Sequence, residues 1–370
     1  MEFKHLNDLL MKEVYSLDRA HKSSLLIEVL RKVAHHHYNN CQPYQNFCKK
    51  RRFNYDKWQQ IEELPYLPAS IFKDALLLSI PENKIFRTIS SSATTSGRSS
   101  RIALDKETSR RQSKCFNKVV LNRLGNKRRK FIVIDTPESV GRNRQVTARS
   151  STIRSLLFCA GKTHTCLEEI DGKFNLDDDK FDKLLLEAEN AKEEIIIFGF
   201  TYILYSVVVR KLLEKKMKYK LKGSKIIHIG GWKKLESEKV SPKKLIADCS
   251  DVFGVNKGDV VDFYGFTEQS GMIYPTCEAG VRHVPIWGEV VVRDQLSLNP
   301  MRIGEEGLLQ FITPIQTSYP GHSVLTEDVG CITGIDDCSC GRKGKTFKVL
   351  GRAKQAEIRG CGDIMAEKFA

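Results

Sequence analysis

The chain has 370 residues, of which 41% are hydrophobic and 28% charged, and its formal net charge is +15. This composition is typical of a globular protein and excludes disordered, collagen-like and low-complexity chains. Because single hydrophobic cores stop growing at about 250–300 residues, we expect one large domain and a smaller piece. The basic clusters are scattered and lack the aromatic spacing of a nucleic-acid module, so we expect no dedicated nucleic-acid binding. A solvated basic surface, or attraction of an anionic nucleotide or acidic partner, explains the charge instead.

No basic stretch followed by an apolar stretch begins the chain, so we expect no signal peptide. The apolar runs are far shorter than the about 20 residues of a membrane span, so we expect none. The 11 cysteines are an odd number. Without an export signal they are interpreted as thiols, metal ligands or a nucleophile rather than a disulfide framework, and we expect a cytoplasmic protein.

The first region, residues 1–84, has a helical pattern, with amphipathic stretches at 6–17 and 23–37. After it, short apolar runs alternate with helical ones. The predicted strands are 131–134, 195–198, 226–229 and 260–264, and the predicted helices are 180–192, 202–216 and 245–249. This alternation predicts an α/β fold with a parallel sheet covered by helices on both faces.

From about residue 286 the pattern changes. Three runs with no helices between them, 289–293, 307–313 and 323–333, predict an antiparallel β subdomain attached to the core. We therefore expect a core over residues 85–350 and a short C-terminal segment over 351–370.

A hydroxyl-rich segment runs from Thr88 to Ser100, where nine of thirteen residues are Ser or Thr. Its hydroxyls, backbone amides and Arg98 suit the binding of phosphate oxygens, and Gly97 permits a turn. The segment is not a Walker loop, because it has no GxxxxGK[ST] pattern. By composition alone, a flexible linker fits as well as a phosphate loop.

The motif Tyr264-Gly-Phe-Thr-Glu268 follows the fourth predicted strand, and Thr326-Glu-Asp-Val-Gly330 and Gly351-Arg352 come later. Together with the Ser/Thr segment and Gly230-Gly231, this order resembles that of adenylate-forming enzymes. Within them the chain most resembles the acyl-protein synthetases of bacterial bioluminescence, which are long-chain fatty acid–protein ligases. The segment Cys338-Ser-Cys-Gly-Arg342 also resembles the related phenylacetate–CoA ligases.

The resemblance implies the adenylate-forming fold with a truncated C-terminal part. It also implies ATP-dependent conversion of a carboxylic, in that family fatty, acid to an acyl-adenylate. Catalysis would depend on positioning and charge neutralisation. In this resemblance, Thr94, Thr95 and Ser96 would hold the β- and γ-phosphates, Thr267 would bind the α-phosphate, and Glu268 would bind a Mg²⁺ ion. Tyr264 would pack on the adenine, and Asp328 would bind the ribose. Arg352 would contact the ribose or the phosphates, and Gly231 and Gly265 would also lie at the nucleotide.

Each of these residues also has a structural interpretation. Tyr264 fits a core aromatic at a strand end, Glu268 a helix cap, and Asp328 a turn residue beside glycine. Arg352 fits a surface ion pair. Their occurrence together, in the order of the family, favours the functional interpretation.

Two departures from the family pattern bear on activity. Ala93 stands where many members have glycine, and its methyl group restricts the backbone of the Ser/Thr segment. The catalytic lysine of larger relatives has no matching position, since the chain ends 18 residues after Arg352. The bioluminescence synthetases are similarly short.

Two groups of cysteines are candidates for chemistry. Cys361 lies between glycines near the C-terminus, where the acyl-protein synthetases carry the cysteine that accepts the acyl group as a thioester; an unreactive thiol is the alternative. Cys331, Cys338 and Cys340 are candidate zinc ligands, with Cys277 or His283 as a fourth. C-x-C is tighter than the usual spacing of about two to four residues, which favours reduced thiols over zinc.

We therefore expect an AMP-forming acid–thiol ligase that passes the acyl group to a cysteine on itself or on a partner, such as an acyl reductase or an acyl carrier. A ligase of the same fold that acylates coenzyme A or a carrier protein is the first alternative. A catalytically degenerate nucleotide- or partner-binding protein is the second.

Overall fold

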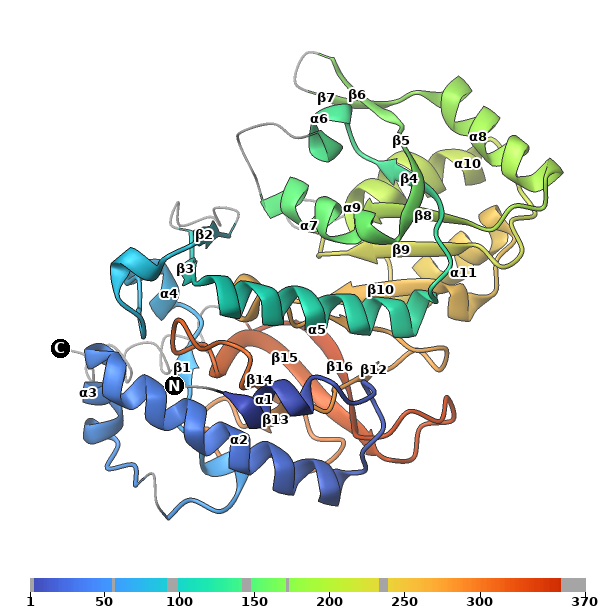
Figure 1. Ribbon diagram of the computed structural model, residues 1–370. Coiled ribbons are helices and arrows are strands. Elements are labelled where there is room, and N and C mark those ends of the chain that lie inside the picture. Colours follow the sequence, from blue (N-terminus) through green and yellow to red (C-terminus); the bar gives the residue numbers. More distant parts are fainter. Residues whose placement is uncertain are drawn as a thin grey trace. The chain divides into compact units, whose positions relative to one another are not determined.

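The computed structural model describes residues 3–54, 57–91, 99–141, 148–170, 173–232 and 239–353. These residues form two compact units (Figure 1). Unit 1 comprises residues 1–119, 265–274 and 281–370, and unit 2 comprises residues 120–264 and 275–280. Helix α5 (Lys106–Leu124) and the short strand β11 (Tyr274–Pro275) each contain a boundary between the units.

Unit 2 is an α/β layer built on parallel strands. Its elements are β4 (Arg129–Ile134), α6 (Pro137–Val140), α7 (Ala148–Leu156), β5 (Ala160–Thr165), β6 (Leu167–Ile170), β7 (Lys173–Leu176), α8 (Asp178–Asn190), β8 (Ile195–Phe200), α9 (Thr201–Ile203), α10 (Arg210–Glu214), β9 (Lys225–Ile229), α11 (Pro242–Phe253) and β10 (Val260–Tyr264). Five strands lie in the order β10-β9-β8-β4-β5, and all four of these pairings are parallel.

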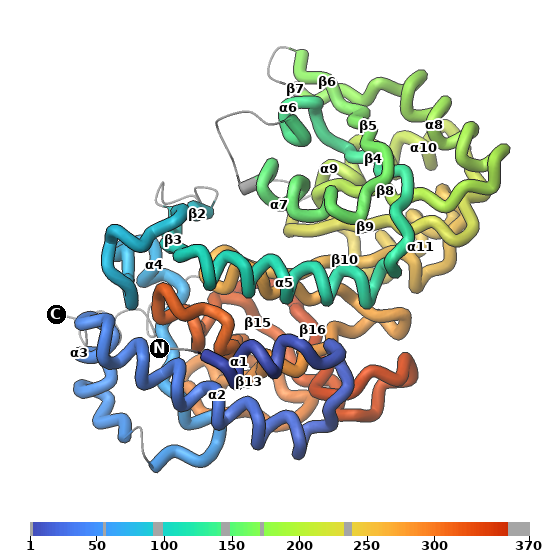
Figure 2. Tube along the Cα trace, in the orientation of Figure 1, coloured from blue at the N-terminus to red at the C-terminus, as the bar shows by residue number. Residues whose placement is uncertain are grey.

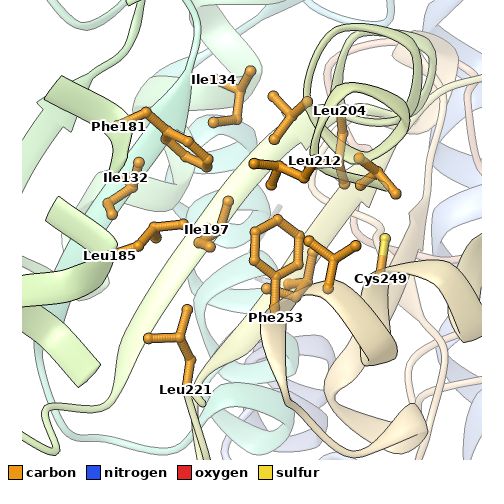
Figure 3. Packing of buried hydrophobic residues seen from close by; sticks show 14 of the residues in the cluster. Ile132, Ile134, Phe181, Leu185, Ile197, Leu204, Leu212, Leu221, Cys249 and Phe253 are labelled. Carbon is orange, nitrogen blue, oxygen red and sulfur yellow. The ribbon is translucent and has the colours of Figure 1, made fainter. Parts of the chain in front are cut away.

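The core of unit 2 lies between one face of this sheet and helices α8, α10 and α11 (Figure 3). Alternate residues of the strands, such as Ile132 and Ile197, point to this face because strand side chains alternate with a period of two. Phe181, Leu185 and Phe253 come from the helices and are buried against them. The predicted parallel sheet with helical cover is therefore confirmed.

Capping residues explain where the helices of unit 2 begin and end. Asp177 accepts a hydrogen bond from the Lys180 amide at the start of α8, and Ser241 does the same for α11. Helix α11 ends at Gly254, which has a φ of +63°. A Cβ atom there would lie 2.3 Å from the Tyr219 carbonyl oxygen, so only glycine fits this helix end.

Unit 1 combines helices with an antiparallel sheet. Its elements are α1 (Lys4–Leu9), α2 (Arg19–Asn40), α3 (Gln42–Lys50), β1 (Leu67–Pro68), α4 (Ile71–Asp74), β2 (Arg87–Ser90), β3 (Arg101–Leu104), β12 (Arg282–His283), β13 (Glu289–Arg293), β14 (Gly307–Ile312), β15 (Ser323–Ile335) and β16 (Lys345–Arg352). The strand order is β12-β16-β15-β14-β13, with antiparallel pairings throughout, and β1 joins β15 in parallel.

Polar side chains are buried across this sheet. The Arg293 guanidinium donates to the Gln310 side chain at 2.5 Å, and Gln310 donates to the Ser323 hydroxyl at 2.9 Å. Arg293 also donates to the backbone carbonyl oxygens of Leu298 and Glu62. These hydrogen bonds link β13, β14 and β15. Because each of these buried polar groups has a partner, its hydrogen bonds compensate for the loss of water.

The N-terminal helices and the C-terminal strands belong to the same unit, although they stand at opposite ends of the chain (Figure 2). The helix expected over 23–37 is α2, which is longer at both ends. The helix expected over 6–17 is wrong in extent, because α1 ends at Leu9. The carbonyl oxygens of residues 10–12 accept hydrogen bonds from the Lys118 ammonium instead, at 3.1, 3.1 and 2.5 Å.

The expected strands at 289–293, 307–313 and 323–333 are confirmed as β13, β14 and β15, and they form the predicted antiparallel sheet. The helix expected over 202–216 is present from 201 to 214, but its middle turn, Leu204–Val209, is a π-helix. The domain boundaries expected at residues 84 and 350 remain predictions.

Candidate active site

The carboxyl ends of the parallel strands in unit 2 bring several candidate residues to one edge. Thr201 follows β8, Gly230 and Gly231 follow β9, and Tyr264 ends β10. The Thr201 hydroxyl donates to the Gly230 carbonyl oxygen at 2.6 Å and lies 2.9 Å from His228 Nδ1. Ligands of open α/β sheets bind outside the carboxyl ends of the strands, so this edge suits a nucleotide.

Tyr264 and Gly231 occupy neighbouring strand ends. Ile229 of β9 pairs with Phe263 of β10, so the residues that follow each of them leave the sheet side by side. Gly231 is exposed, and the Tyr264 side chain is half-buried. An aromatic side chain at a strand end is the kind of group on which a planar ligand packs.

Glu268 lies in unit 1, in a single 3-10 turn formed by Thr267–Gln269. It is 7% exposed, and the Tyr319 hydroxyl donates to its backbone carbonyl oxygen at 2.9 Å. Burial raises the pKa of the Glu268 carboxyl group, while a hydrogen bond from the Ser100 hydroxyl and the charge of Lys73 oppose this shift. A buried carboxylate of this kind gains most from a cation.

The turn that holds Glu268 is fixed by its surroundings. The Gln269 side chain donates to the carbonyl oxygens of Phe311 and Gly321, each at 2.9 Å. Gly271, two residues on, has a φ of +90°, and a Cβ atom there would lie 2.5 Å from Gln112 Cβ. Only glycine permits the backbone to lie this close to Gln112, so a larger residue at position 271 would displace the backbone that follows the Glu268 turn.

The base of the Ser/Thr segment lies beside Glu268. Strands β2 and β3 pair as far as Ser90 and Arg101, and Ser91 and Ser100 extend this pairing by one residue on each side. The Ser91 amide donates to the Ser100 carbonyl oxygen, and the Ser100 amide to the Ser91 hydroxyl, each at 2.9 Å. Thr94, Thr95 and Ser96 themselves lie outside the described residues.

Asp328 and Arg352 face each other across β15 and β16. Asp328 Oδ1 and Arg352 Nε are 3.5 Å apart; the Arg352 side chain is 67% exposed, whereas that of Asp328 is 18% exposed. The Asp328 amide also donates to the Thr326 hydroxyl at 3.2 Å. Cys361 lies outside the described residues.

A comparison with family descriptions matches residues 4–370 to the family "Acyl-protein synthetase, LuxE". The chain belongs to this family. It is 24% identical over 350 residues to the long-chain-fatty-acid–luciferin-component ligase of Aliivibrio fischeri, covering 92% of this chain and 87% of that protein. The ligase of the same name from Vibrio harveyi is 22% identical over 357 residues, covering 94% and 89%.

Solved structures of 2-hydroxyisobutyryl-CoA ligase share the fold. An open conformation in complex with 2-HIB-AMP and CoA has a TM-score of 0.67 at 13% identity, covering 92% of this chain and 71% of that one. The same ligase in its thioesterification state has a TM-score of 0.68 at 14% identity, covering 92% and 70%. The expected adenylate-forming α/β fold is confirmed.

As a LuxE-family acyl-protein synthetase, the protein is an AMP-forming acid–thiol ligase that activates a carboxylic acid with ATP and transfers the acyl group. The expected family and reaction class are thus confirmed, and the catalytically degenerate alternative is set aside. Among the helices in the described ranges, none has the length and apolar character needed to cross a bilayer.

Three residues of this acyl-protein synthetase contribute to the surroundings of Glu268 but were not predicted from the sequence. They are Ser100, Lys73 and Glu327, which act on the Glu268 pKa through a hydrogen bond, attraction and repulsion respectively. They come from three separate segments of unit 1. Ser100 ends the Ser/Thr-rich segment and Glu327 lies in the Thr326–Gly330 motif, so both had a usable signal, whereas Lys73, 195 residues before Glu268 in the chain, lies in no motif.

The cysteines group differently from the expected set. Cys338 and Cys340 lie with His283 and Cys277 in a group that could hold a metal ion, and Cys331 is not a member of it. Cys331 lies within β15, whereas Cys338 and Cys340 follow that strand in the loop before β16. Strand geometry therefore separates Cys331 from the other two.

Proposed function

We propose that this synthetase uses ATP and Mg²⁺ to convert a long-chain fatty acid to its acyl-adenylate and passes the acyl group to Cys361. The observation that carries the proposal is the buried Glu268 carboxylate beside the base of the Ser/Thr segment. A carboxylate beside the base of a hydroxyl-rich segment offers the kinds of groups that a metal–polyphosphate complex requires.

The first step joins the acid to the nucleotide. An oxygen of the fatty acid carboxylate attacks the α-phosphorus of ATP, the new P–O bond forms, and pyrophosphate leaves with the electron pair of the broken bond. No proton has to be removed from the attacking carboxylate, so the protein's task is to align the two anions and to offset their repulsion.

Glu268 suits the metal ion in this step. Its oxygen atoms are the donors that Mg²⁺ prefers, and the pKa that burial raises would be lowered by a bound cation. Mg²⁺ would supply charge neutralisation for the phosphates. Thr94, Thr95 and Ser96 would hold the β- and γ-phosphates through hydroxyl and amide donors, because the base of their segment adjoins Glu268.

The nucleoside roles fall on the remaining residues. Tyr264 would pack on the adenine beside Gly231 and Gly265, and Thr267 would donate a hydrogen bond to the α-phosphate. Tyr264 and Glu268 are four residues apart, so their Cα atoms lie within about 14 Å of each other whatever the arrangement of the units. Asp328 would accept hydrogen bonds from the ribose hydroxyls.

Arg352 suits a role at the ribose or phosphates because most of its side chain is exposed. Its guanidinium already lies against the Asp328 carboxylate. A ribose bound by Asp328 would thus lie within reach of a fixed positive charge, and the exposed part of the guanidinium has donors left for phosphate oxygens.

In the second step the Cys361 thiolate would attack the carbonyl carbon of the adenylate, a thioester bond would form and AMP would leave. The proposed fatty acid substrate follows from the names of the relatives from Aliivibrio fischeri and Vibrio harveyi. Transfer onward to a partner such as an acyl reductase or an acyl carrier would follow from the thioester. Coenzyme A is the competing acceptor, because the structurally similar ligase was solved with CoA.

The experiment separates the two steps. ATP–pyrophosphate exchange is measured over straight-chain fatty acids and aromatic acids, and the intact protein is then weighed by mass spectrometry. We expect exchange with fatty acids and a mass increase of one acyl group. Cys361→Ser should keep the exchange and lose the mass increase, whereas the matched variant Cys331→Ser should keep both.

Two results would contradict the proposal. Exchange with aromatic acids alone would reject the fatty acid substrate. An acyl group that remains on Cys361→Ser, or that appears only on added coenzyme A, would reject Cys361 as the acceptor.

A further inference from the structure

A group of soft ligand atoms lies away from Glu268, where β15 turns into β16. Cys338 and Cys340 lie in this loop, and His283 lies in β12, which pairs with β16 through His283 and Thr346. Cys340 Sγ is 3.2 Å from His283 Nε2. Two sulfur atoms and a ring nitrogen from separate elements therefore converge within unit 1.

The loop is held in one shape before any ligand binds. The Gly344 amide donates to the Asp336 carboxylate at 2.6 Å, and the Asp336 amide donates to the Gly344 carbonyl oxygen at 3.1 Å. Inside this closure the Gly341 amide donates to the Cys338 carbonyl oxygen at 3.0 Å, and Gly341 has a φ of +82°. Such a turn keeps the two cysteines of C-x-C close together.

The ligand atoms are close enough together to bind one metal ion. Sγ of Cys338, Sγ of Cys340 and a ring nitrogen of His283 all lie within 4.8 Å of one another, and Cys277 is the fourth member of the group. In a tetrahedral site with Zn–S of about 2.3 Å and Zn–N of about 2.0–2.1 Å, ligand atoms are about 3.5–3.8 Å apart. The sequence spacing alone argued against zinc, but the ligands come from two sequence-distant segments rather than from one motif.

The donor set points to zinc rather than to the magnesium of the proposed nucleotide site. Thiolate and imidazole are soft or borderline ligands, which bind Zn²⁺ in preference to oxygen-seeking cations. His283 is 1% exposed, so its ring orientation is fixed by packing, including an edge contact with Tyr15 at 5.6 Å between ring centroids. A fixed imidazole reduces the entropy lost when a metal binds.

We propose that His283, Cys338 and Cys340, with Cys277 as the fourth ligand, bind one structural Zn²⁺ ion. Binding would release the three thiol protons and leave a site with a net charge of −1. Arg342, two residues beyond Cys340, lies 5.9 Å from the Tyr15 ring and brings a positive charge into this part of unit 1. All four zinc positions are taken by protein, so the ion holds β12 to the β15–β16 loop and has no open position for catalysis.

The test uses the full untagged chain, expressed with zinc in the medium. Elemental analysis should find about one zinc ion per chain, and a thiol-specific mercurial should release it while a chromogenic zinc indicator is present. Replacement by Co²⁺ should give the intense visible bands of tetrahedral cobalt with thiolate charge transfer. These measurements need no variant, so a misfolded mutant cannot obscure the result.

Variants then assign the ligands. Cys340→Ser should lose most of the zinc, and Cys277→Ser should lose it if the fourth ligand is assigned correctly, while far-ultraviolet circular dichroism checks the fold. Cys331→Ser is the matched control, because Cys331 lies in the same strand-and-loop region but outside the group. It should keep the zinc and the cobalt spectrum.

The proposal is overturned if the unmodified protein carries no zinc and its thiols react freely under native conditions. It is also overturned if Cys340→Ser keeps full zinc content, or if Cys331→Ser loses it. Zinc retained by Cys277→Ser alone would reject the four-ligand set. None of these readouts depends on acyl transfer, so the proposed function can fail without affecting this one.

Discussion

Each unit has a cluster of buried apolar side chains, but the two units differ in how they bury charge. In unit 2, one continuous cluster of aliphatic and aromatic side chains fills the space between the parallel sheet and its helices. In unit 1, the antiparallel sheet buries an ionic group: Glu289 lies 3.7 Å from the Lys22 ammonium and 3.4 Å from that of Lys345. The side chains of Lys22 and Glu289 are 2% and 4% exposed.

Because of this difference, the energetic consequence of changing a buried residue depends on the unit in which it lies. Most of the buried residues of unit 2 contribute apolar area, which is favourable by about 25 cal/mol per Å² of buried surface. In unit 1 a buried charge is tolerated because its partners are buried with it, and it becomes costly as soon as one partner is removed. The polar interior of unit 1 also contains Glu268, so a carboxylate with a structural role and the proposed metal-binding carboxylate have to be told apart by experiment.

The largest effect is expected from Glu289→Gln, which removes the carboxylate beside the buried Lys22 ammonium and leaves the Lys345 ammonium with Glu62, 3.8 Å away. It should lower the free energy of unfolding by about 3–5 kcal/mol. Urea unfolding at neutral pH measures this, with the exposed Glu306→Gln as control. A loss below about 1 kcal/mol, the value of an exposed pair, would show that the group is open to water.

The pH dependence of this effect follows from the Glu289 pKa. Burial would raise it, but Lys22 and Lys345 outweigh burial and hold it below its usual range. A lowered carboxyl pKa in the folded state stabilises the protein above the unfolded-state pKa, and this stabilisation is lost as the pH falls through the folded-state value. The difference between wild type and Glu289→Gln should therefore shrink in acid.

Ile197→Ala is the corresponding change in unit 2, at the centre of the apolar cluster. It should cost about 2–5 kcal/mol, because it removes buried methyl groups and leaves a cavity. The cost should be the same at neutral and acid pH, unlike that of Glu289→Gln. Hydrogen exchange followed by mass spectrometry should locate the loss of protection in unit 2, and Leu186→Ala, at a side chain that is 44% exposed, should have little effect.

Glu268→Gln should leave stability nearly intact but lower ATP–pyrophosphate exchange by about 100-fold or more, since a metal ligand is worth several kcal/mol in a transition state. Because burial raises the Glu268 pKa, exchange in the wild type should fall on the acid side as this carboxyl takes up a proton. Glu327 also raises that pKa, so Glu327→Gln should move the acid limb to lower pH without loss of maximal rate. Excess Mg²⁺ should shift the wild-type limb in the same direction.

The smallest effect on stability is expected from Arg352→Ala. Its exposed ion pair with Asp328 contributes about 0–1 kcal/mol, so unfolding should change little. The KM for ATP should nevertheless rise several-fold if Arg352 contacts the nucleotide. An unchanged KM for ATP would indicate that Arg352 serves only as a surface ion-pair partner of Asp328.

Short-range patterns allowed much of the fold to be predicted. The aliphatic runs at 195–198 and 260–264 are strands because buried parallel strands are apolar on both faces. The predicted helix over 6–17 is too long, and the carbonyl oxygens of residues 10–12, which a longer helix would pair internally, accept hydrogen bonds from the distant Lys118 ammonium. Periodicity contains no information about such a partner.

The candidate site could be named from the sequence only where it consists of local motifs. Tyr264, Thr267 and Glu268 could be named from one pentapeptide, and Asp328 from another. The surroundings of Glu268 could not, because Ser100, Lys73 and Glu327 reach it only through the packing of unit 1. The cysteines illustrate the same limit: Cys338 and Cys340 suggested a metal site, but Cys331, which was grouped with them, is not a member of the group that could hold an ion.

The sequence alone was enough to identify the family, the reaction class and the succession of parallel and antiparallel strands, since these depend on residue order and on the alternation of apolar and polar positions. Tertiary structure alone decided which charges are buried together, what acts on the Glu268 carboxyl, and which histidine meets the cysteines of the β15–β16 loop. Those outcomes depend on distances between segments far apart in the chain, which arise only when the sheet of unit 1 pairs its strands and buries its polar groups.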